Sequence, residues 1–419
     1  MNVRLFRHFR SSWLLVPAAL CALAVVASAR QSTPAGLPEP TQAHTNPINL
    51  LPLVHQAYHR FYNLDFAGAV SLFQQLRRQY PGDPQATALL LNAVVFQALY
   101  QKDLLDTTFY ANDGFLSGHH ATEEDPADRQ RVFSLTDQAV SEADARLSRN
   151  PKDVDALYAR GWARSLKCAY VAMVERGFSG AFRLATKAKD DEQRVLQLDP
   201  EYTDAKLVVG VYQYVVGALP WPFKLLIGFV GISGSKSQGM ALLWDDAEHG
   251  ICTRLEARTV IALFLRREGK YKQAIQVVRG LEAEYPHDFL FALEEANLRK
   301  DDGEGMLAVD AYRKVLSDAV RPGYFPNARL ELADYGLGEA LRGQRHYKQA
   351  AEAYEHAGWT HGTGAELRVR TMLAAGQCRD LAGERQPALR DYQEAIDAGP
   401  GTSRADTARK YLRSPYRGN

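Results

Sequence analysis

Excess charge of either sign is absent from this sequence. Its 419 residues include 50 lysines and arginines against 49 aspartates and glutamates, so the net charge is +1 with the histidines neutral. A protein that binds nucleic acid or an anionic membrane by general electrostatics needs a one-sided basic surplus. The composition therefore argues against nucleic acid as a partner. With 46% hydrophobic and 24% charged residues, the chain has ample material for a folded core.

Motifs that carry enzymatic or metal chemistry are also missing. No Cys-x-x-Cys pair or Cys/His spacing suggests a zinc site, and no Ser/His/Asp, Cys/His or paired-carboxylate unit can be discerned. The glycine-rich run 228–237 has a lysine, but Ser235 separates Gly234 from Lys236 and breaks the phosphate-loop spacing. We therefore expect no enzymatic activity and no cofactor. Ser235 or Ser237 is expected to cap the helix that follows.

The apolar run at the N-terminus is too short for the ~20 residues that span a bilayer. It extends from Trp13 to Val26, follows three arginines within residues 4–10 and precedes the small-x-small sequence Ala27–Ala29. This order is typical of an export signal that is cleaved, here after Ala29. We expect an exported protein that is periplasmic or associated with the cell envelope; an uncleaved anchor is the alternative.

The stretch from Gly269 to Pro286 contains the pattern that recurs through the chain. Gly269 is expected to end one helix, and Pro286 to end the next. The small residue Ala274 allows a neighbouring helix to approach closely. On a helix, four apolar positions fall on one face, namely Tyr271, Ala274, Val278 and Leu281. These features are typical of the second helix of a helical hairpin.

Copies of this pattern occur at Phe66-Ala69-Phe73-Pro81, Gly303-Ala308-Tyr312, Tyr347-Ala350-Tyr354-Ala357 and Gly383-Ala388-Tyr392-Ala395-Pro400. The sequence here resembles the tetratricopeptide repeat family, whose unit has 34 residues and this arrangement of alanine, aromatic and proline. The predicted fold is all-α, a right-handed superhelix (α-solenoid) of about eight helical-hairpin repeats with three insertions. The resemblance implies that a concave face, lined by the first helix of each hairpin, holds a peptide or a partner helix.

The repeats divide the chain into five predicted segments. These are a signal peptide (1–29), a flexible proline-rich linker (30–48), irregular repeats with insertions (49–253), regular repeats with a capping helix (254–413) and a tail (414–419). The regular repeats are expected at 255–288, 289–322, 331–364 and 369–402, with the cap at Ser403–Leu412. Cys168, Cys252 and Cys378 are each more than a full repeat apart, so we expect no disulfide between them.

Three insertions interrupt the irregular repeats. In the second repeat, residues Lys102–Arg129 separate the first helix from a partner helix expected around Gln138 to Asn150. The third unit, 154–200, is longer by about 15 residues, with a first helix continuing to about Arg176 and a second marked by Ala188 onward. In the fourth repeat, Gly217–Ser235 lies between the two helices.

Two of the insertions contain candidate interaction residues. The first has His119 and His120 near Glu123, Glu124 and Asp125, which could bind a divalent metal, although adjacent histidines favour a solvated polar loop and we predict no metal site. The third contains Ala218–Ile232, the most apolar segment after the signal. That segment could contact a membrane surface, bind a partner, or fold back into the groove.

The predicted concave face is aromatic in its N-terminal half and mostly cationic in its C-terminal half. An aromatic wall suits apolar side chains, whereas arginine and lysine beside asparagine suit a partner's carboxylates and backbone. Packing between helices would explain the aromatics equally well, and a solvated face the cations. The predicted partner-binding residues are Tyr58, Phe61, Tyr62, Tyr158, Trp162, Tyr214, Arg266, Arg267, Asn297, Lys300, Tyr335, Glu339, Arg342 and Arg370.

The sequence thus predicts an exported, non-catalytic scaffold that binds a protein or peptide partner in its concave groove within the cell envelope. The alternative is a peripheral component of an envelope or outer-membrane complex, attached through residues 218–232. A repeat architecture by itself does not specify the partner, because function depends on the site and not on the fold.

Overall fold

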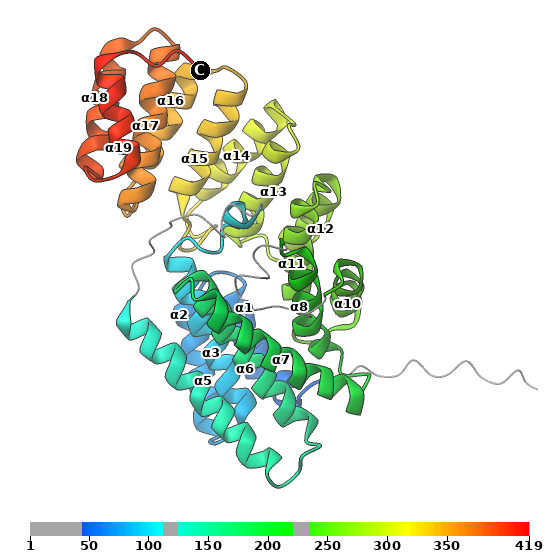
Figure 1. Cartoon of the computed structure of the whole chain (residues 1–419). Coiled ribbons are helices and arrows are strands. Elements are labelled where there is room, and N and C mark those ends of the chain that lie inside the picture. Colours follow the sequence, from blue (N-terminus) through cyan, green and yellow to red (C-terminus); the bar gives the residue numbers. More distant parts are fainter. Residues whose placement is uncertain (1–43, 112–124, 221–233, 419) are drawn as a thin grey trace, which may run out of the picture. The chain divides into compact units, whose positions relative to one another are not determined.

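The computed structural model describes residues 44–111, 125–220 and 234–418. Within these ranges the chain forms 17 α-helices and no strand (Figure 1). Each helix packs mainly against its neighbours in the sequence. The described chain is therefore an all-α solenoid of helical hairpins, as predicted.

Eight hairpins and a final helix make up the array. The hairpins are α1 (Pro52–Phe61) with α2 (Phe66–Gln79), α3 (Pro84–Gln101) with α5 (Pro126–Leu147), α6 (Val154–Met173) with α7 (Phe178–Leu198), α8 (Lys206–Ala218) with α10 (Lys236–His249), α11 (Arg254–Arg267) with α12 (Tyr271–Glu284), α13 (Phe289–Asp301) with α14 (Met306–Ala319), α15 (Leu330–Gly343) with α16 (Tyr347–Trp359), and α17 (Ala365–Leu381) with α18 (Arg385–Ala398). Helix α19 (Ser403–Arg413) follows, and 3-10 helices cover Pro47–Leu50 (η1), Thr107–Tyr110 (η2) and Thr203–Ala205 (η3).

Local sequence explains where these helices begin and end. The Asp153 and Asp288 side chains accept hydrogen bonds from the first free amides of α6 and α13. Ser235 caps α10 in the same way, which confirms one of the two predicted caps. Gly269 has a φ of 69° after α11, a left-handed conformation that glycine adopts without strain and that ends the helix.

Small residues set the distance between paired helices. Ala274 and Ala350 are fully buried, as the pattern predicts. A Cβ atom at Gly338 of α15 would lie 2.7 Å from the Tyr354 ring of α16, so glycine is required for that approach. The rings that fill the space between helices, such as Tyr312, are likewise inaccessible to solvent.

Two predicted helix limits in the irregular half are wrong. Helix α5 begins at Pro126, well before Gln138, because Asp125 caps it and proline suits its first turn. In the third hairpin, α6 ends at Met173 and α7 already begins at Phe178, so the extra length is shared by both helices instead of extending only the first.

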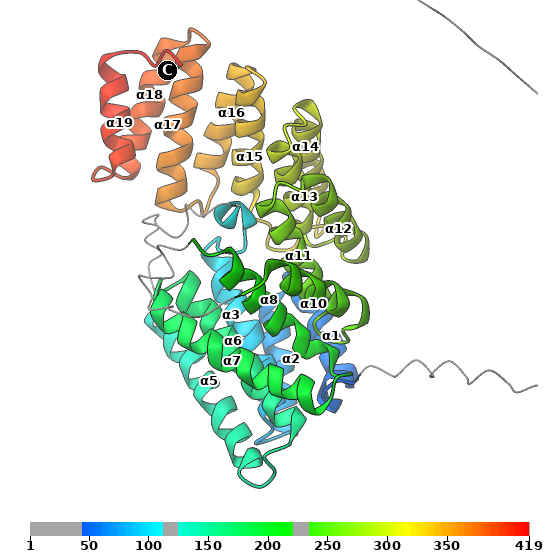
Figure 2. The same cartoon turned by 45° about the vertical axis from the view of Figure 1, so that its right-hand side comes forward.

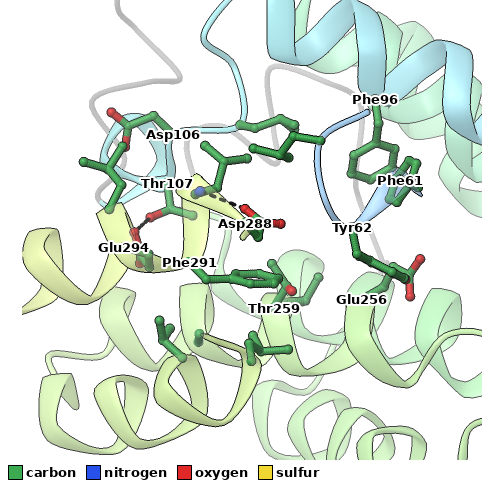
Figure 3. A pocket seen from close by; sticks show the side chains of 18 of the residues that line it. Phe61, Tyr62, Phe96, Asp106, Thr107, Glu256, Thr259, Asp288, Phe291 and Glu294 are labelled. Carbon is green, nitrogen blue, oxygen red and sulfur yellow. Dashed lines mark hydrogen bonds between the residues drawn. The ribbon is translucent and has the colours of Figure 1, made fainter. Parts of the chain in front are cut away.

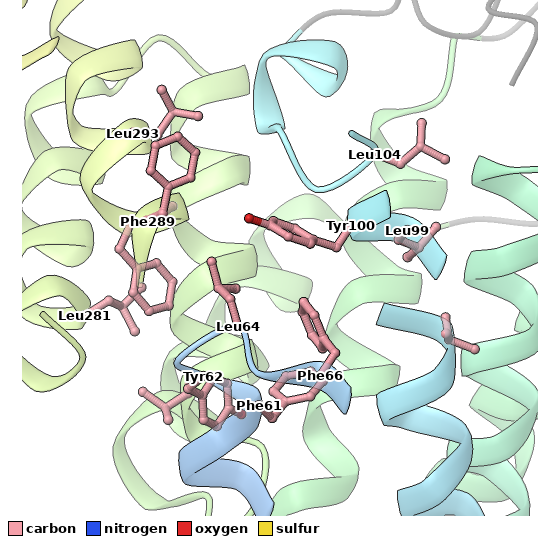
Figure 4. Close-up of a cluster of buried hydrophobic side chains, with 14 of the residues drawn as sticks. Phe61, Tyr62, Leu64, Phe66, Leu99, Tyr100, Leu104, Leu281, Phe289 and Leu293 are labelled. Atoms are coloured by element: carbon pink, nitrogen blue, oxygen red, sulfur yellow. The ribbon is translucent and has the colours of Figure 1, made fainter. Parts of the chain in front are cut away.

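The first two hairpins also contact later repeats that are distant in sequence. The Tyr100 hydroxyl donates to the Asn327 carbonyl at 2.5 Å, and the Asn327 side chain donates to the Leu64 carbonyl at 3.3 Å. Tyr62 packs against Tyr285, with ring centroids 5.1 Å apart. Figure 4 shows this junction, where side chains from α1, α3, α12 and α13 form one buried apolar cluster. The solenoid is therefore closed by contacts beyond neighbouring repeats.

Several predictions concern residues outside the described ranges. They include the export signal, most of the linker, the His119/His120 group and residues 221–233 of the apolar segment. The three cysteines at 168, 252 and 378 are free, as expected. None of the helices in the described ranges has the length and hydropathy needed to cross a membrane.

Candidate binding site on the inner face of the repeats

The first helices of the fifth and sixth hairpins, α11 and α13, carry Arg266 and Asn297 on the face predicted to bind a partner. That face is covered by part of the same chain. Residues 104–110, which follow α3 and include η2, pack against it together with the end of α1 (Figure 3). The segment found here belongs to the first insertion. The sequence had suggested a different one, the apolar residues 218–232 of the third insertion, as the segment that folds back into the groove.

Arg266 is the centre of the polar contacts at this junction. Its side chain is 1% exposed, and Nη1 donates to the Thr107 hydroxyl at 2.6 Å and to Glu294 at 3.2 Å. Nε donates to Asp301 at 2.9 Å. Thr107 in turn donates to Glu294. Burial raises the pKa of Glu294 to about 7 although Arg266 opposes this shift, so the guanidinium compensates a carboxylate that would otherwise be costly to bury.

Arg267 and Asn297 hold the same segment from either side. The Arg267 guanidinium donates to the backbone carbonyl of Tyr110 at 2.6 Å. The Asn297 amide donates to Asp106 at 3.4 Å and accepts from the Tyr312 hydroxyl at 2.6 Å. Three of the residues predicted to bind a partner thus bind a short piece of the chain itself, through side-chain and backbone groups.

A partly enclosed cavity of about 180 Å³ remains between this segment, α1, α11 and α13. Its wall is mainly apolar and includes Phe61, Phe66, Phe96 and Phe291 (Figure 3). Asp106, Glu256, Asp288 and Glu294 also contribute to the wall, although the carboxyl oxygens of Glu256 are not accessible from the cavity. No basic side chain contributes to this wall within the part of the chain that the structure describes.

Most of these polar groups are hydrogen bonded to other parts of the chain, whereas Glu256 and Tyr62 interact with each other. Asp288 caps α13 through Leu290, and Glu294 is bound by Arg266 and Thr107. The Glu256 carboxyl oxygens and the Tyr62 hydroxyl are buried without a hydrogen bond of ordinary geometry, although Tyr62 lies beside Glu256 (Figure 3). Burial raises the pKa of Glu256 to about 7.

The six predicted aromatic residues pack within the protein instead of forming an open wall. Phe61 and Tyr62 line the cavity, and Tyr58 packs between them and Phe73. Further along, Tyr158 contacts Tyr202, Tyr214 stacks on Phe264, and Trp162 is 5% exposed. Packing between helices, the alternative considered for these residues, accounts for their positions because large aromatic surfaces favour burial.

The predicted residues of the seventh and eighth hairpins are more open. Arg370 of α17 lies over the Tyr335 ring of α15, 4.2 Å from its centroid, and neither Arg370 nor Arg342 has a carboxylate partner among the described residues. Arg342 donates to the Tyr416 hydroxyl at 3.4 Å. Glu339 accepts from Tyr354, and Lys300 of the sixth hairpin lies 3.6 Å from Asp301. These residues do not reach the cavity.

Several residues of the site were missed by sequence analysis, among them Glu256, Asp106 and Thr107. Glu256 could have been found, because it is a carboxylate on the inner face of an otherwise regular first helix. Asp106 and Thr107 could not, since their position depends on a long-range contact between the first insertion and α11. No cluster of His, Cys, Asp or Glu suited to a metal ion is found in the described residues, and Asp125 of the first insertion caps α5.

Comparison with known proteins gives weak similarities only. No family model and no curated protein matches this sequence. Among solved structures, a tetratricopeptide repeat protein from Parabacteroides merdae is 18% identical over 76% of this chain and 97% of its own, with a TM-score of 0.33. The human IFIT1 dimer with m7Gppp-AAAA is 11% identical over 89% of this chain and 84% of its own, with a TM-score of 0.41. Yeast Tom70 is 11% identical over 86% of this chain and 88% of its own, with a TM-score of 0.34. The assignment of the fold rests on the helices themselves.

Proposed function

We propose that this protein is an exported, non-catalytic scaffold that binds an acidic segment of a partner protein on the inner face of its last two hairpins. The observation that carries the proposal is Arg370, whose half-buried guanidinium lies on Tyr335 without a carboxylate partner in the described chain. Arginine side chains in such positions are normally paired. A carboxylate from a partner would complete the arrangement.

The neighbouring hairpins support this choice of surface. Arg266 and Arg342 occupy the same position in the first helices of the fifth and seventh repeats. Arg266 binds carboxylates and a hydroxyl of the chain's own segment, whereas Arg342 has only the Tyr416 hydroxyl. Bidentate contacts between arginine and carboxylate combine charge with fixed geometry, so Arg342 and Arg370 together favour an acidic peptide.

Export is part of the proposal because the N-terminal sequence has the order of a cleaved signal. It places the partner in the cell envelope. The test is to measure the mass of the protein recovered from outside the cytoplasm. This mass should correspond to a chain that begins after Ala29. Recovery of the full-length chain from the cytoplasm alone would contradict this part of the proposal.

The scaffold is tested by crosslinking in intact cells with a charge-reversed variant. Arg342→Glu combined with Arg370→Glu should lose a partner that the wild type captures, because both contacts become repulsive. The matched control is Lys272→Glu with Arg313→Glu, which makes the same change of charge at exposed positions on α12 and α14. Loss in both variants, or in neither, would contradict binding at the last two hairpins.

A further inference from the structure

A second pocket lies between the first two hairpins, away from the site described above. Helices α2, α3 and α5 lie side by side there (Figure 2), and α3 packs against both of the others. The pocket has a volume of about 280 Å³, and the buried side chains of Leu90 and Leu135 form its base. The rest of its wall consists of polar and cationic residues of α2 and α5, and no carboxylate of the described chain contributes to it.

The helical register directs these polar residues to the pocket. Residues that are three or seven positions apart lie on one face of a helix. Arg131, Ser134 and Gln138 share such a face of α5, as Gln74 and Arg77 do on α2. The two faces meet, because Nη2 of Arg77 donates to Oε1 of Gln138 at 2.5 Å. Two polar stripes therefore border the same pocket.

The two arginines of this wall form no ion pair with any carboxylate in the described ranges. Arg77 has the Gln138 amide as its only hydrogen-bond partner there, and the Arg131 side chain has none. In the hairpins that follow, the half-buried Arg146 and Arg160 each form ion pairs with two aspartates. Two like charges on one pocket repel each other, and an anion between them would replace this repulsion with attraction.

Gln138 fixes the position of the Arg77 guanidinium before any ligand binds. Its Nε2 donates to Glu142 at 2.7 Å, and the Thr87 hydroxyl donates to the same carboxylate at 2.7 Å. The amide oxygen of Gln138 is thereby directed at Arg77, whose other donors are available to a ligand. Glu142 itself does not line the pocket. A side chain that is already held loses less conformational freedom on binding.

We infer that this pocket binds a small organic phosphate monoester, with the phosphate group between Arg77 and Arg131 and the organic group against Leu90 and Leu135. A phosphate monoester has a second pKa of about 6, so at neutral pH its two charges match two arginines. Its oxygens also fit the planar donor pairs of guanidinium groups. The Ser134 hydroxyl lines the pocket as a further donor.

The volume of the pocket limits the organic group. About 280 Å³ exceeds the ~150 Å³ of an engineered cavity that binds benzene, so a phosphate group with one ring fits. Phenyl phosphate is therefore a suitable probe, and phenyl sulfate has nearly the same shape with a single negative charge. The inference is independent of the proposed function, whose arginines lie on the last two hairpins and do not line this pocket.

The test is isothermal titration calorimetry of the purified chain with these two probes. At pH 7.5 the wild type should bind phenyl phosphate more tightly than phenyl sulfate. The difference should shrink at pH 5, because the phosphate monoester then carries one charge while the arginines stay charged. Equal binding of the two probes at pH 7.5, or no binding of phenyl phosphate, would overturn the inference.

Arg131→Gln should weaken the binding of phenyl phosphate about tenfold or more, the amount expected for one charge-assisted contact. The matched control is Arg78→Gln. Arg78 follows Arg77 on α2, is exposed and does not line the pocket, so this variant has the same change of net charge and should bind like the wild type. Equal binding by the two variants would contradict a site at Arg131.

A variant that keeps both arginines separates a shaped site from general attraction between charges. Ser134→Phe fills part of the pocket, and the protein should remain helical by circular dichroism because Ser134 is exposed. This variant should lose most of its affinity for phenyl phosphate. If it binds as tightly as the wild type, the anion is held by surface charge alone and the inferred site is wrong.

Discussion

At the scale of single residues, buried ionisable groups determine how stability responds to pH. The pKa of Glu256 rises from its ordinary value of 4.5 to about 7 because burial disfavours the charged form. The folded state then binds the proton more tightly than the unfolded state, so this group's contribution to stability falls as pH rises from about 4.5 to 7. One pKa unit corresponds to ~1.4 kcal/mol, so the loss is about 3 kcal/mol.

Glu256→Gln removes this titration. We expect the stability of the variant, relative to the wild type, to improve by about 2.5 kcal/mol between pH 5 and pH 8. Urea unfolding followed by circular dichroism at the two pH values measures the difference. Glu248→Gln, on the exposed side of α10, should show no such change. An unchanged difference would mean that Glu256 is already ionised at pH 5 in the folded protein.

Arg266 illustrates the reverse case, a buried charge whose partners depend on it. Arg266→Met leaves Glu294 buried beside Thr107 without its cation, and should lower stability by about 3–5 kcal/mol. Adding Glu294→Gln should recover part of this loss, because the second change removes the uncompensated carboxylate. Thermal melting of the single and double variants tests the pair. A double variant less stable than Arg266→Met would contradict this explanation.

At the scale of the helical hairpin, close packing leaves little room for additional atoms. A methyl group at Gly338 would overlap the Tyr354 ring, whereas nothing lies within 4 Å of the corresponding position at Gly343 near the end of the same helix. Gly338→Ala should therefore lower stability by about 1–3 kcal/mol. Gly343→Ala should be neutral or raise stability by up to about 1 kcal/mol, since alanine favours a helix.

Chemical denaturation of the two variants measures this contrast. Both substitutions add the same methyl group to α15, so their difference isolates the contact with α16. If Gly338→Ala were as stable as Gly343→Ala, the two helices would be able to move apart without loss, and the tight contact between them would not be required for the fold.

The period of the sequence was sufficient to predict the hairpins but not every helix limit. Small and aromatic residues recur at positions equivalent to Ala274 and Tyr354 because every hairpin packs its two helices in the same way. That pattern is visible in the sequence. The start of α5 depended on a local cap, Asp125 with Pro126, inside a segment interpreted as an insertion. The cap was present in the sequence, and the alanine pattern obscured it.

At the scale of the whole described array, the candidate site depends on contacts that local sequence does not encode. Arg266 and Asn297 were predicted to face inward, and they do contact another segment, but that segment belongs to the same chain. Nothing near residues 104–110 specifies α11 and α13 as their neighbours. The cavity follows from this closure and so could not be predicted.

Closure also changes how the array should unfold. In a simple solenoid each repeat is stabilised by its neighbours alone, so a local change has a local effect. Here Arg329, just before α15, forms an ion pair with Asp103, just after α3, at 2.8 Å, and also with Glu331. Arg329 therefore links parts of the chain that are separated by several hairpins. Its loss should destabilise the structure at both ends of the contact.

Arg329→Met should increase amide hydrogen exchange in two separate regions, residues 99–110 and the start of α15, because both lose the same partner. The matched control is Arg254→Met, which removes an ion pair with Glu284 inside one hairpin and should affect only α11 and α12. Hydrogen exchange followed by mass spectrometry reports both regions in one experiment. If exchange in Arg329→Met increased around residue 329 alone, the closing contact would contribute nothing to the stability of the first repeats, and the array would behave as a simple solenoid.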